Sequence, residues 1–131
     1  MVILLDCNIW ITLSINKQLD LVLRLIEKEH TLVSCQQLES ELLDVINRPK
    51  LKRFLPSKTI DYIHLIFKRS TANYEIGTVP IVVTDPKDNY LFALCKKSNA
   101  HYFVTGDKLL LGEKQYGNTK IITLAELKNL L

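Results

Sequence analysis

Short apolar runs of strand length, without alternating polar residues, constrain the fold of this chain more than any other feature. One run covers residues 2–5 and stops at Asp6, and another covers 102–104 and leads to Asp107. Such runs are typical of strands buried on both faces, as in a parallel sheet covered by helices. Ligands bind beyond the carboxyl ends of the strands in these sheets. The sequence therefore predicts an α/β fold whose polar residues gather at one edge of the sheet.

Segments with helical spacing separate the apolar runs, so strands and helices alternate along the chain. The expected strands are 2–5, 31–33, 81–83, 102–104 and 120–122. The expected helices are 9–14, 19–28, 35–47, 57–68, 88–98 and a terminal helix after residue 123. This order indicates a three-layer α/β/α, Rossmann-like domain, and right-handed crossovers would make its central sheet largely parallel.

Local signals suggest where several helices begin, end and face the core. Ser34 with Gln37, and Thr123 with Glu126, have the spacing of capping boxes. Pro49 is expected to end the helix before it, since the residue preceding a proline disfavours the α region. The helix at 19–28 is expected to turn three apolar residues inward: Leu21, Leu25 and Ile26.

Length and composition predict one domain over residues 1–131. The chain has 131 residues, of which 47% are hydrophobic, enough for one ordinary core and too few for two. Its formal net charge of +3 permits a polyanionic partner without requiring one. Charge alone therefore does not choose the function.

The cysteines and the N-terminus point to a cytoplasmic protein without a membrane segment. The three cysteines have no Cys-x-x-Cys spacing and no histidine at zinc-site spacing, so they are expected to be reduced core thiols. The apolar residues before Asp6 are too few for a signal peptide or a membrane span.

Four segments each place one carboxylate where a parallel sheet would bring it to the same edge, and together they suggest a metal site: Asp6, Glu41, Asp88 and Asp107. Glu41 lies within a predicted helix. The helical periodicity excludes Asp44 as an acid of the site, but it does not decide between Glu39 and Glu41. Asp88 also has a structural explanation, because Asp85 and Asp88 could form a turn and cap the next helix.

Four motifs in order give the chain a resemblance to a known family. They are Asp6-Cys7-Asn8, the segment from Glu41 to Lys50, the segment from Asp85 to Leu94, and Val104-Thr105-Gly106-Asp107-Lys108. Together they look like the PIN-domain nucleases, and most closely the VapC-like PIN-family toxins of type II toxin–antitoxin systems. The resemblance covers essentially the whole chain.

The resemblance implies that Asp6, Glu41, Asp88 and Asp107 form an acidic catalytic quartet that holds Mg²⁺ or Mn²⁺, and it favours Glu41 over Glu39. Asn8 would orient the acids from behind, and Thr105 would line the site. The chain departs from the family at two positions. Cys7 stands where Thr or Ser is commoner, and Leu109 stands where relatives often carry a further acid, so a fifth carboxylate is not expected at that position.

The chemistry of clustered carboxylates agrees with this implication. Converging carboxylates repel one another and bind protons at raised pKa unless a cation neutralises them. A hard divalent cation with open positions suits hydrolysis of a phosphodiester by an activated water, leaving a 5′-phosphate and a 3′-hydroxyl. A metal-free route through the RNA 2′-hydroxyl normally needs a general base and acid, and none of His30, His64 and His101 abuts a strand carboxyl end.

An acidic site needs basic groups elsewhere to hold RNA. Candidate cations are Arg48, Lys50, Lys52, Arg53, Lys87 and Lys108, with Lys68 and Arg69 as further choices. The cluster near residue 50 also reads as an ordinary solvated surface. Trp10, Phe54 or Tyr90 could stack an unpaired base, although core packing is the commoner use of such residues.

Three function classes follow. The first is a metal-dependent endoribonuclease toxin that cleaves RNA, pairs with a cognate antitoxin protein, and forms a homodimer or higher assembly. The second is another metal-dependent phosphoryl hydrolase of α/β fold, which would need a neighbouring acid pair or a second acid two residues after Asp6, where Asn8 stands. The third is a non-catalytic or antitoxin-binding module on the PIN fold.

Overall fold

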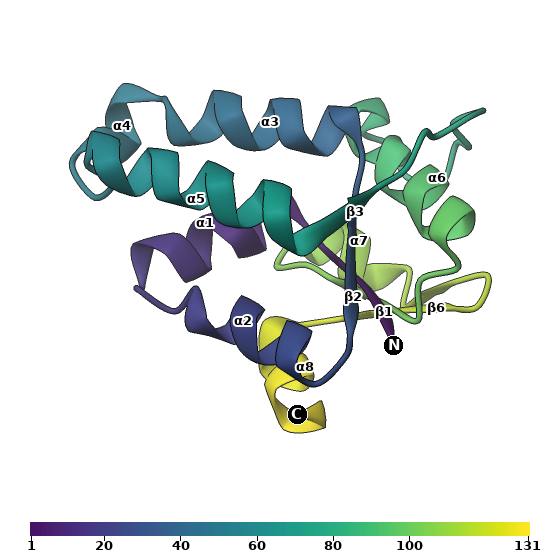
Figure 1. Cartoon of the computed structure of the whole chain (residues 1–131). Coiled ribbons are helices and arrows are strands. Elements are labelled where there is room, and N and C mark those ends of the chain that lie inside the picture. The colour runs from purple at the N-terminus through teal and green to yellow at the C-terminus, as the bar shows by residue number, and fades with distance from the viewer.

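A six-stranded sheet with the order β3-β2-β1-β4-β6-β5 forms the centre of the computed structural model, which describes residues 1–131 (Figure 1). Five strands are parallel: β1 (Val2–Leu5), β2 (Thr31–Ser34), β3 (Thr71–Asn73), β4 (Tyr102–Val104) and β6 (Thr119–Ile122). The short β5 (Gln115–Tyr116) pairs antiparallel with β6. The prediction of an α/β fold with a largely parallel sheet is confirmed.

Helices cover the sheet and extend beyond it. In chain order they are α1 (Cys7–Ile15), α2 (Asp20–Glu27), α3 (Gln36–Ile46), α4 (Pro49–Lys52), α5 (Ser57–Ser70), the 3₁₀ turn η1 (Pro86–Asp88), α6 (Asn89–Ser98), α7 (Lys108–Gly112) and α8 (Leu124–Leu130). In Figure 1, α1, α2 and α5 lie to the left of β1 and β2, whereas α6 lies to their upper right, above β6. Helices α3 and α5 run side by side, and α4 joins them at the end farthest from the sheet.

Aromatic side chains join the helices to the core, which contains a cluster of 30 buried residues. Trp10 of α1 meets Phe67 of α5 edge to face, with ring centroids 5.1 Å apart. Phe92 of α6 meets Phe103 of β4 in the same way at 6.0 Å. These contacts fix α5 against α1 and α6 against β4, and so position the residues that α5 and α6 carry.

The expected strand at 81–83 is wrong. Ile81 is 95% exposed, and the backbone N–H groups of Val82 and Val83 donate to Oδ1 of Asn89 at 3.1 and 2.9 Å instead of to a strand. The free edge of β2 is occupied by β3, a short segment of Thr-Ala-Asn that follows α5 directly. Its three residues have no hydrophobic pattern, so they carried no strand signal.

Helix ends differ from prediction in some details. The capping box at Thr123 and Glu126 is confirmed. The one at Ser34 is wrong, because Ser34 ends β2 and its hydroxyl bonds to that of Thr71 at 3.0 Å. Ile26 is exposed, and the buried positions of α2 are Leu21, Val22 and Leu25. Helix α7 and strand β5 were not predicted.

The helices are all too short or too polar to cross a lipid bilayer.

Candidate active site

The carboxyl ends of β1 and β4 create the centre of the site. The two strands are adjacent and parallel, with Leu5 opposite Val104. The backbone N–H of Asp6 donates to the carbonyl of Val104 at 2.9 Å, which extends the pairing one residue further. Asp6 and the turn that carries Thr105 and Asp107 therefore meet at one sheet edge, as predicted from the apolar runs.

Asp6 is buried and its carboxylate is firmly held. It is 6% exposed, Oδ1 accepts from the backbone N–H of Cys7 at 2.7 Å, and Oδ2 accepts from the Thr105 hydroxyl at 2.7 Å. The same hydroxyl accepts from the backbone N–H of Asp107 at 3.1 Å. Thr105 thus lies beneath the site, where it links the two acids.

Asp107 and Asn8 shape the turn after β4. Asp107 is the N-cap of α7, and its Oδ1 accepts from the backbone N–H of Leu109 at 2.9 Å. Oδ1 of Asn8 accepts from the backbone N–H of Gly106 at 3.4 Å. Asn8 therefore connects the start of α1 with the turn that carries Asp107.

Asp88 reaches the site without a preceding strand. It closes η1 and precedes α6, and its side chain makes no capping hydrogen bond. Asp85 does the capping, because its Oδ1 accepts from the backbone N–H of Lys87 at 3.2 Å. The capping explanation therefore applies to Asp85 and leaves the Asp88 carboxylate free.

The structure separates the two glutamates that helix periodicity left open. Glu39 faces α5, where its Oε2 lies 3.0 Å from Nε2 of His64 and 3.2 Å from Nζ of Lys68. Glu41 lines the cavity with the other acids, and its Oε2 accepts a hydrogen bond from the hydroxyl of Tyr90 on α6.

All four predicted acids line one open cavity of about 380 Å³. The complete lining is Asp6, Cys7, Asn8, Ile11, Thr12, Glu41, Val45, Asp85, Lys87, Asp88 and Asp107. Asp85 is a fifth acid in the cavity, although it was predicted only as a turn and capping residue. Its position three residues before Asp88, with Pro86 between them, was the available signal.

Burial and the charges of neighbouring carboxylates disfavour the charged forms of Asp6 and Asp88. Burial raises the pKa of Asp6 from 3.8 to about 6; the Thr105 and Cys7 hydrogen bonds oppose the rise, and the charges of Glu41 and Asp88 add to it. The pKa of Asp88 is also raised, first by burial and then by the neighbouring carboxylates, while Lys87 opposes the rise. The site concentrates negative charge that the protein itself does not neutralise.

The donor set fits a hard divalent cation. Every acid offers carboxylate oxygens, which suit Mg²⁺ or Mn²⁺ better than a soft metal, and the open cavity leaves room for water or substrate oxygens. The carboxylates share the cavity without three or more of them forming a compact ligand cluster. The chemistry of the residues therefore matches such an ion.

Neither the Cys7 thiol nor any of the three histidines is suited to metal-free catalysis in this cavity. Burial, followed by the charges of Glu41 and Asp6, raises the pKa of Cys7 to about 12, so its thiol stays protonated. The three histidines lie outside the cavity, and each makes a hydrogen bond elsewhere. His30 bonds to the N-terminal amine and His64 to the carboxylate of Glu39, and His101 accepts from the backbone N–H of Val2.

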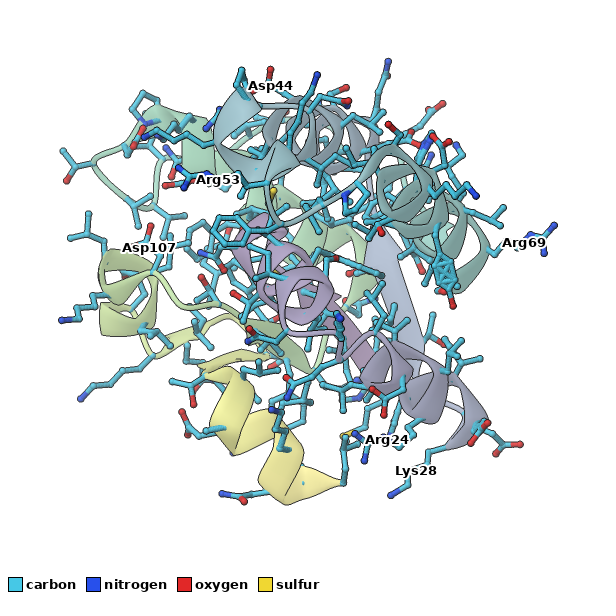
Figure 2. The ribbon with its side chains drawn as sticks, turned by 90° about the vertical axis from the view of Figure 1, so that its left-hand side faces the viewer. Arg24, Lys28, Asp44, Arg53, Arg69 and Asp107 are labelled. Carbon is cyan, nitrogen blue, oxygen red and sulfur yellow. The ribbon has the colours of Figure 1, made fainter.

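The predicted basic residues are spread over several positions. Lys87 lines the cavity and lies 3.6 Å from Asp85, Lys108 begins α7, and Lys68 pairs with Glu39. Arg48 pairs with Asp44 at 2.9 Å, whereas the other cations around α4 make no ion pair: Lys50, Lys52 and Arg53. In Figure 2, Arg53 lies on the same side of the molecule as Asp107, and Arg69 points away on the opposite side.

The three candidate base platforms differ in exposure. Trp10 is buried in the core, which confirms the commoner of its two predicted uses and excludes it as a stacking platform. Phe54 is 58% exposed beside α4 and stays a candidate. Tyr90 is half-buried, and its hydroxyl donates a hydrogen bond to the carboxylate of Glu41.

Comparison with known proteins identifies the fold and the family. No curated protein matches the chain significantly. A chain in the crystal structure of VapBC2 from Rickettsia felis, bound to a DNA fragment from their promoter, superposes with a TM-score of 0.61 at 15% identity, over 94% of this chain and 98% of that one. At that identity the likeness concerns the fold. The family model of the PIN domain matches residues 2–109, a range that contains all the acids of the cavity, and the chain therefore belongs to the PIN domain family.

Proposed function

We propose that this protein is a metal-dependent endoribonuclease and the toxin component of a toxin–antitoxin system, with residues 1–131 acting as one nuclease domain. The observation that carries the proposal is the shared cavity of Asp6, Glu41, Asp88 and Asp107, which come from four separate segments. The raised pKa of Asp6 and of Asp88 supports it, because burial first and the neighbouring carboxylates second disfavour the charged forms, and a bound cation offsets both effects.

In this proposal the four acids hold Mg²⁺ or Mn²⁺, which when bound supplies a water of lowered pKa and a positive charge for the phosphate oxygens. Thr105 fixes one oxygen of Asp6, so that this carboxylate keeps its orientation. Asn8 steadies the turn before Asp107. Lys87, at the rim, offers a charge-assisted contact to the scissile phosphate.

Contacts with RNA extend beyond the cavity in the proposed complex. Lys108 adjoins Asp107, and the cations near α4 lie at the end of the α3–α5 pair (Figure 1). We assign phosphate contacts to Arg48, Lys50, Lys52, Arg53, Lys87 and Lys108. A second cavity of about 370 Å³, near the β5–β6 hairpin, has no carboxylate in its lining and is not a rival site for metal-assisted hydrolysis.

The proposed partner is a cognate antitoxin protein. The VapBC2 complex, with its promoter DNA, supplies the precedent on the same fold. We further propose a homodimer or a higher assembly, and a cytoplasmic location, where the three free buried cysteines stay reduced. A small gene beside that of this chain, encoding the antitoxin, would support this assignment.

Cleavage of a labelled single-stranded RNA tests the activity. The protein is incubated with Mg²⁺ or Mn²⁺, with and without a chelator, beside Asp6→Asn and Asp88→Asn. We expect metal-dependent cleavage that leaves 5′-phosphates and is lost in both variants. Asp61→Asn is the control, since Asp61 is exposed on α5, lies outside the cavity and makes no ion pair.

Two results would contradict the proposal. Cleavage that persists in both cavity variants would place the activity elsewhere. No cleavage by folded protein with either metal would favour a non-catalytic, antitoxin-binding module on this fold.

A further inference from the structure

Tyr90 and Glu41 form a contact between two helices at the edge of the acid cavity. Glu41 lies on α3 and Tyr90 lies in the first turn of α6, 49 positions later in the chain. The Tyr90 hydroxyl donates to Oε2 of Glu41 at 2.5 Å. A phenol bonded to a carboxylate makes a charge-assisted hydrogen bond, which is shorter and stronger than a neutral one.

The contact is exclusive on both sides. Glu41 makes no other side-chain hydrogen bond and no ion pair, so its Oε1 has no partner within the protein. Tyr90 packs its ring against the hydrophobic core and is not part of the cavity lining. The phenol therefore approaches Glu41 from behind and leaves one carboxylate oxygen available to the cavity.

A glutamate on a helix surface needs such a contact to keep one orientation. Its side chain has several rotamers, and fixing them costs about 1.5–2 kcal/mol of conformational entropy. Asp6 is fixed by two hydrogen-bond donors, and Asp107 by its cap on α7. Tyr90 is the single group that does this for Glu41, and it lies in the first turn of α6, two residues after Asp88, which closes η1.

We propose that Tyr90 is a positioning residue that orients Glu41 for divalent metal binding by holding Oε2 and directing Oε1 into the cavity. The inference rests on the proposed function and deepens it, because it adds to the four acids a residue that touches neither metal nor substrate. It also couples α3 to α6, so that Glu41 and Asp88 keep a fixed separation.

Mn²⁺ binding measured by calorimetry tests the proposal independently of cleavage. Tyr90→Phe keeps the ring and removes only the hydroxyl. We expect about tenfold weaker Mn²⁺ binding, in the range typical for loss of a group that orients a metal ligand. Tyr116→Phe is the matched control, because Tyr116 is also half-buried against the core, outside the acid cavity, and its hydroxyl makes no hydrogen bond. It should bind Mn²⁺ like the wild type.

A double-mutant cycle with Glu41→Gln shows whether Tyr90 affects Mn²⁺ affinity through Glu41. If Tyr90 acts through Glu41, adding Tyr90→Phe to Glu41→Gln changes Mn²⁺ affinity no further, and circular dichroism melts without metal confirm that each variant is folded. Wild-type affinity in Tyr90→Phe would overturn this inference alone, as would an equal loss in both backgrounds. Failure of the wild type to bind Mn²⁺ would overturn the proposed function as well.

Discussion

The hydroxyl of Thr105 donates a hydrogen bond of 2.7 Å to Oδ2 of Asp6, across 99 positions of the chain. It also accepts from the backbone N–H of Asp107 at 3.1 Å. One fully buried hydroxyl thus joins the acid after β1 to the acid after β4. The parallel pairing of these strands makes the contact possible, because both carboxyl ends lie at the same edge.

Replacing Thr105 with valine should destabilise the protein and weaken the site. The change keeps the shape but leaves Oδ2 of Asp6 without its donor and the Asp107 N–H without its acceptor. We expect a loss of about 1–3 kcal/mol in the free energy of unfolding, measured by urea denaturation at pH 7. Thr105→Ser retains the hydroxyl and should recover most of the loss; equal losses in both variants would show that packing, not hydrogen bonding, is responsible.

The stability of the metal-free protein should fall as the pH rises from about 4 to about 6. The folded-state pKa of Asp6 is raised from 3.8 to about 6, so the folded form holds this proton more tightly than the unfolded form. Protonated Asp6 therefore contributes about 3 kcal/mol to the free energy of unfolding. This contribution is fully present below pH 3.8 and is lost above pH 6. Urea denaturation across this range should show the fall in the wild type and a much smaller one in Asp6→Asn, in which the raised pKa of Asp88 and the lowered pKa of Glu39 act in opposite directions.

Divalent metal should stabilise the protein only where the acids are ionised. At pH 7.5, Mn²⁺ at one hundred times its dissociation constant should add about 2.7 kcal/mol to the free energy of unfolding. At pH 4.5 protons compete for Asp6, and the stabilisation should largely vanish. Differential scanning fluorimetry with and without chelator measures the metal-induced change in melting temperature at each pH. An equal change at the two pH values would place the bound metal outside this cavity.

Phe67 should contribute far more to stability than Phe54. Phe67 is buried against Trp10, so Phe67→Ala removes the contact that fixes α5 on α1 and should cost about 3–5 kcal/mol. Phe54 is exposed, and Phe54→Ala should change the free energy of unfolding by less than about 0.5 kcal/mol. If Phe54→Ala instead weakens RNA binding while the fold is unchanged, that residue stacks on a base.

Removing the cations near α4 should weaken RNA binding and lower its dependence on salt. Each phosphate contact on a single strand contributes about 0.7 to the slope of log affinity against log salt. A triple change to glutamine at Lys50, Lys52 and Arg53 should therefore reduce the slope by about 2, measured by fluorescence anisotropy with Asp6→Asn to prevent cleavage.

The matched control removes the same charge from Arg24, Lys28 and Arg69, which lie away from Asp107 in Figure 2. It should leave the slope unchanged. Equal reductions in both triple variants would mean that RNA binds through net charge and not through the α4 end of the molecule.

Much of the fold followed from local sequence. Strands such as β1 and β4 were predictable because their apolar runs can only be buried, and α8 because Thr123 and Glu126 satisfy its first backbone donors. Strand β3 was not predictable. Its three residues have no hydrophobic pattern, and they pair with β2 only because α5 delivers them to a free edge.

The sequence by itself determined the parallel α/β fold and the placement of Asp6 and Asp107 at one sheet edge, since burial and strand direction decide both. Only the tertiary structure decided that Glu41 enters the cavity while Glu39 turns to His64 and Lys68, and that Asp85 takes the capping role and leaves Asp88 free. Helix periodicity places a side chain on a face, but its hydrogen-bond partners come from elements distant in the chain. The cavity depends on those partners, and on the packing of α3 and α6 that brings them together.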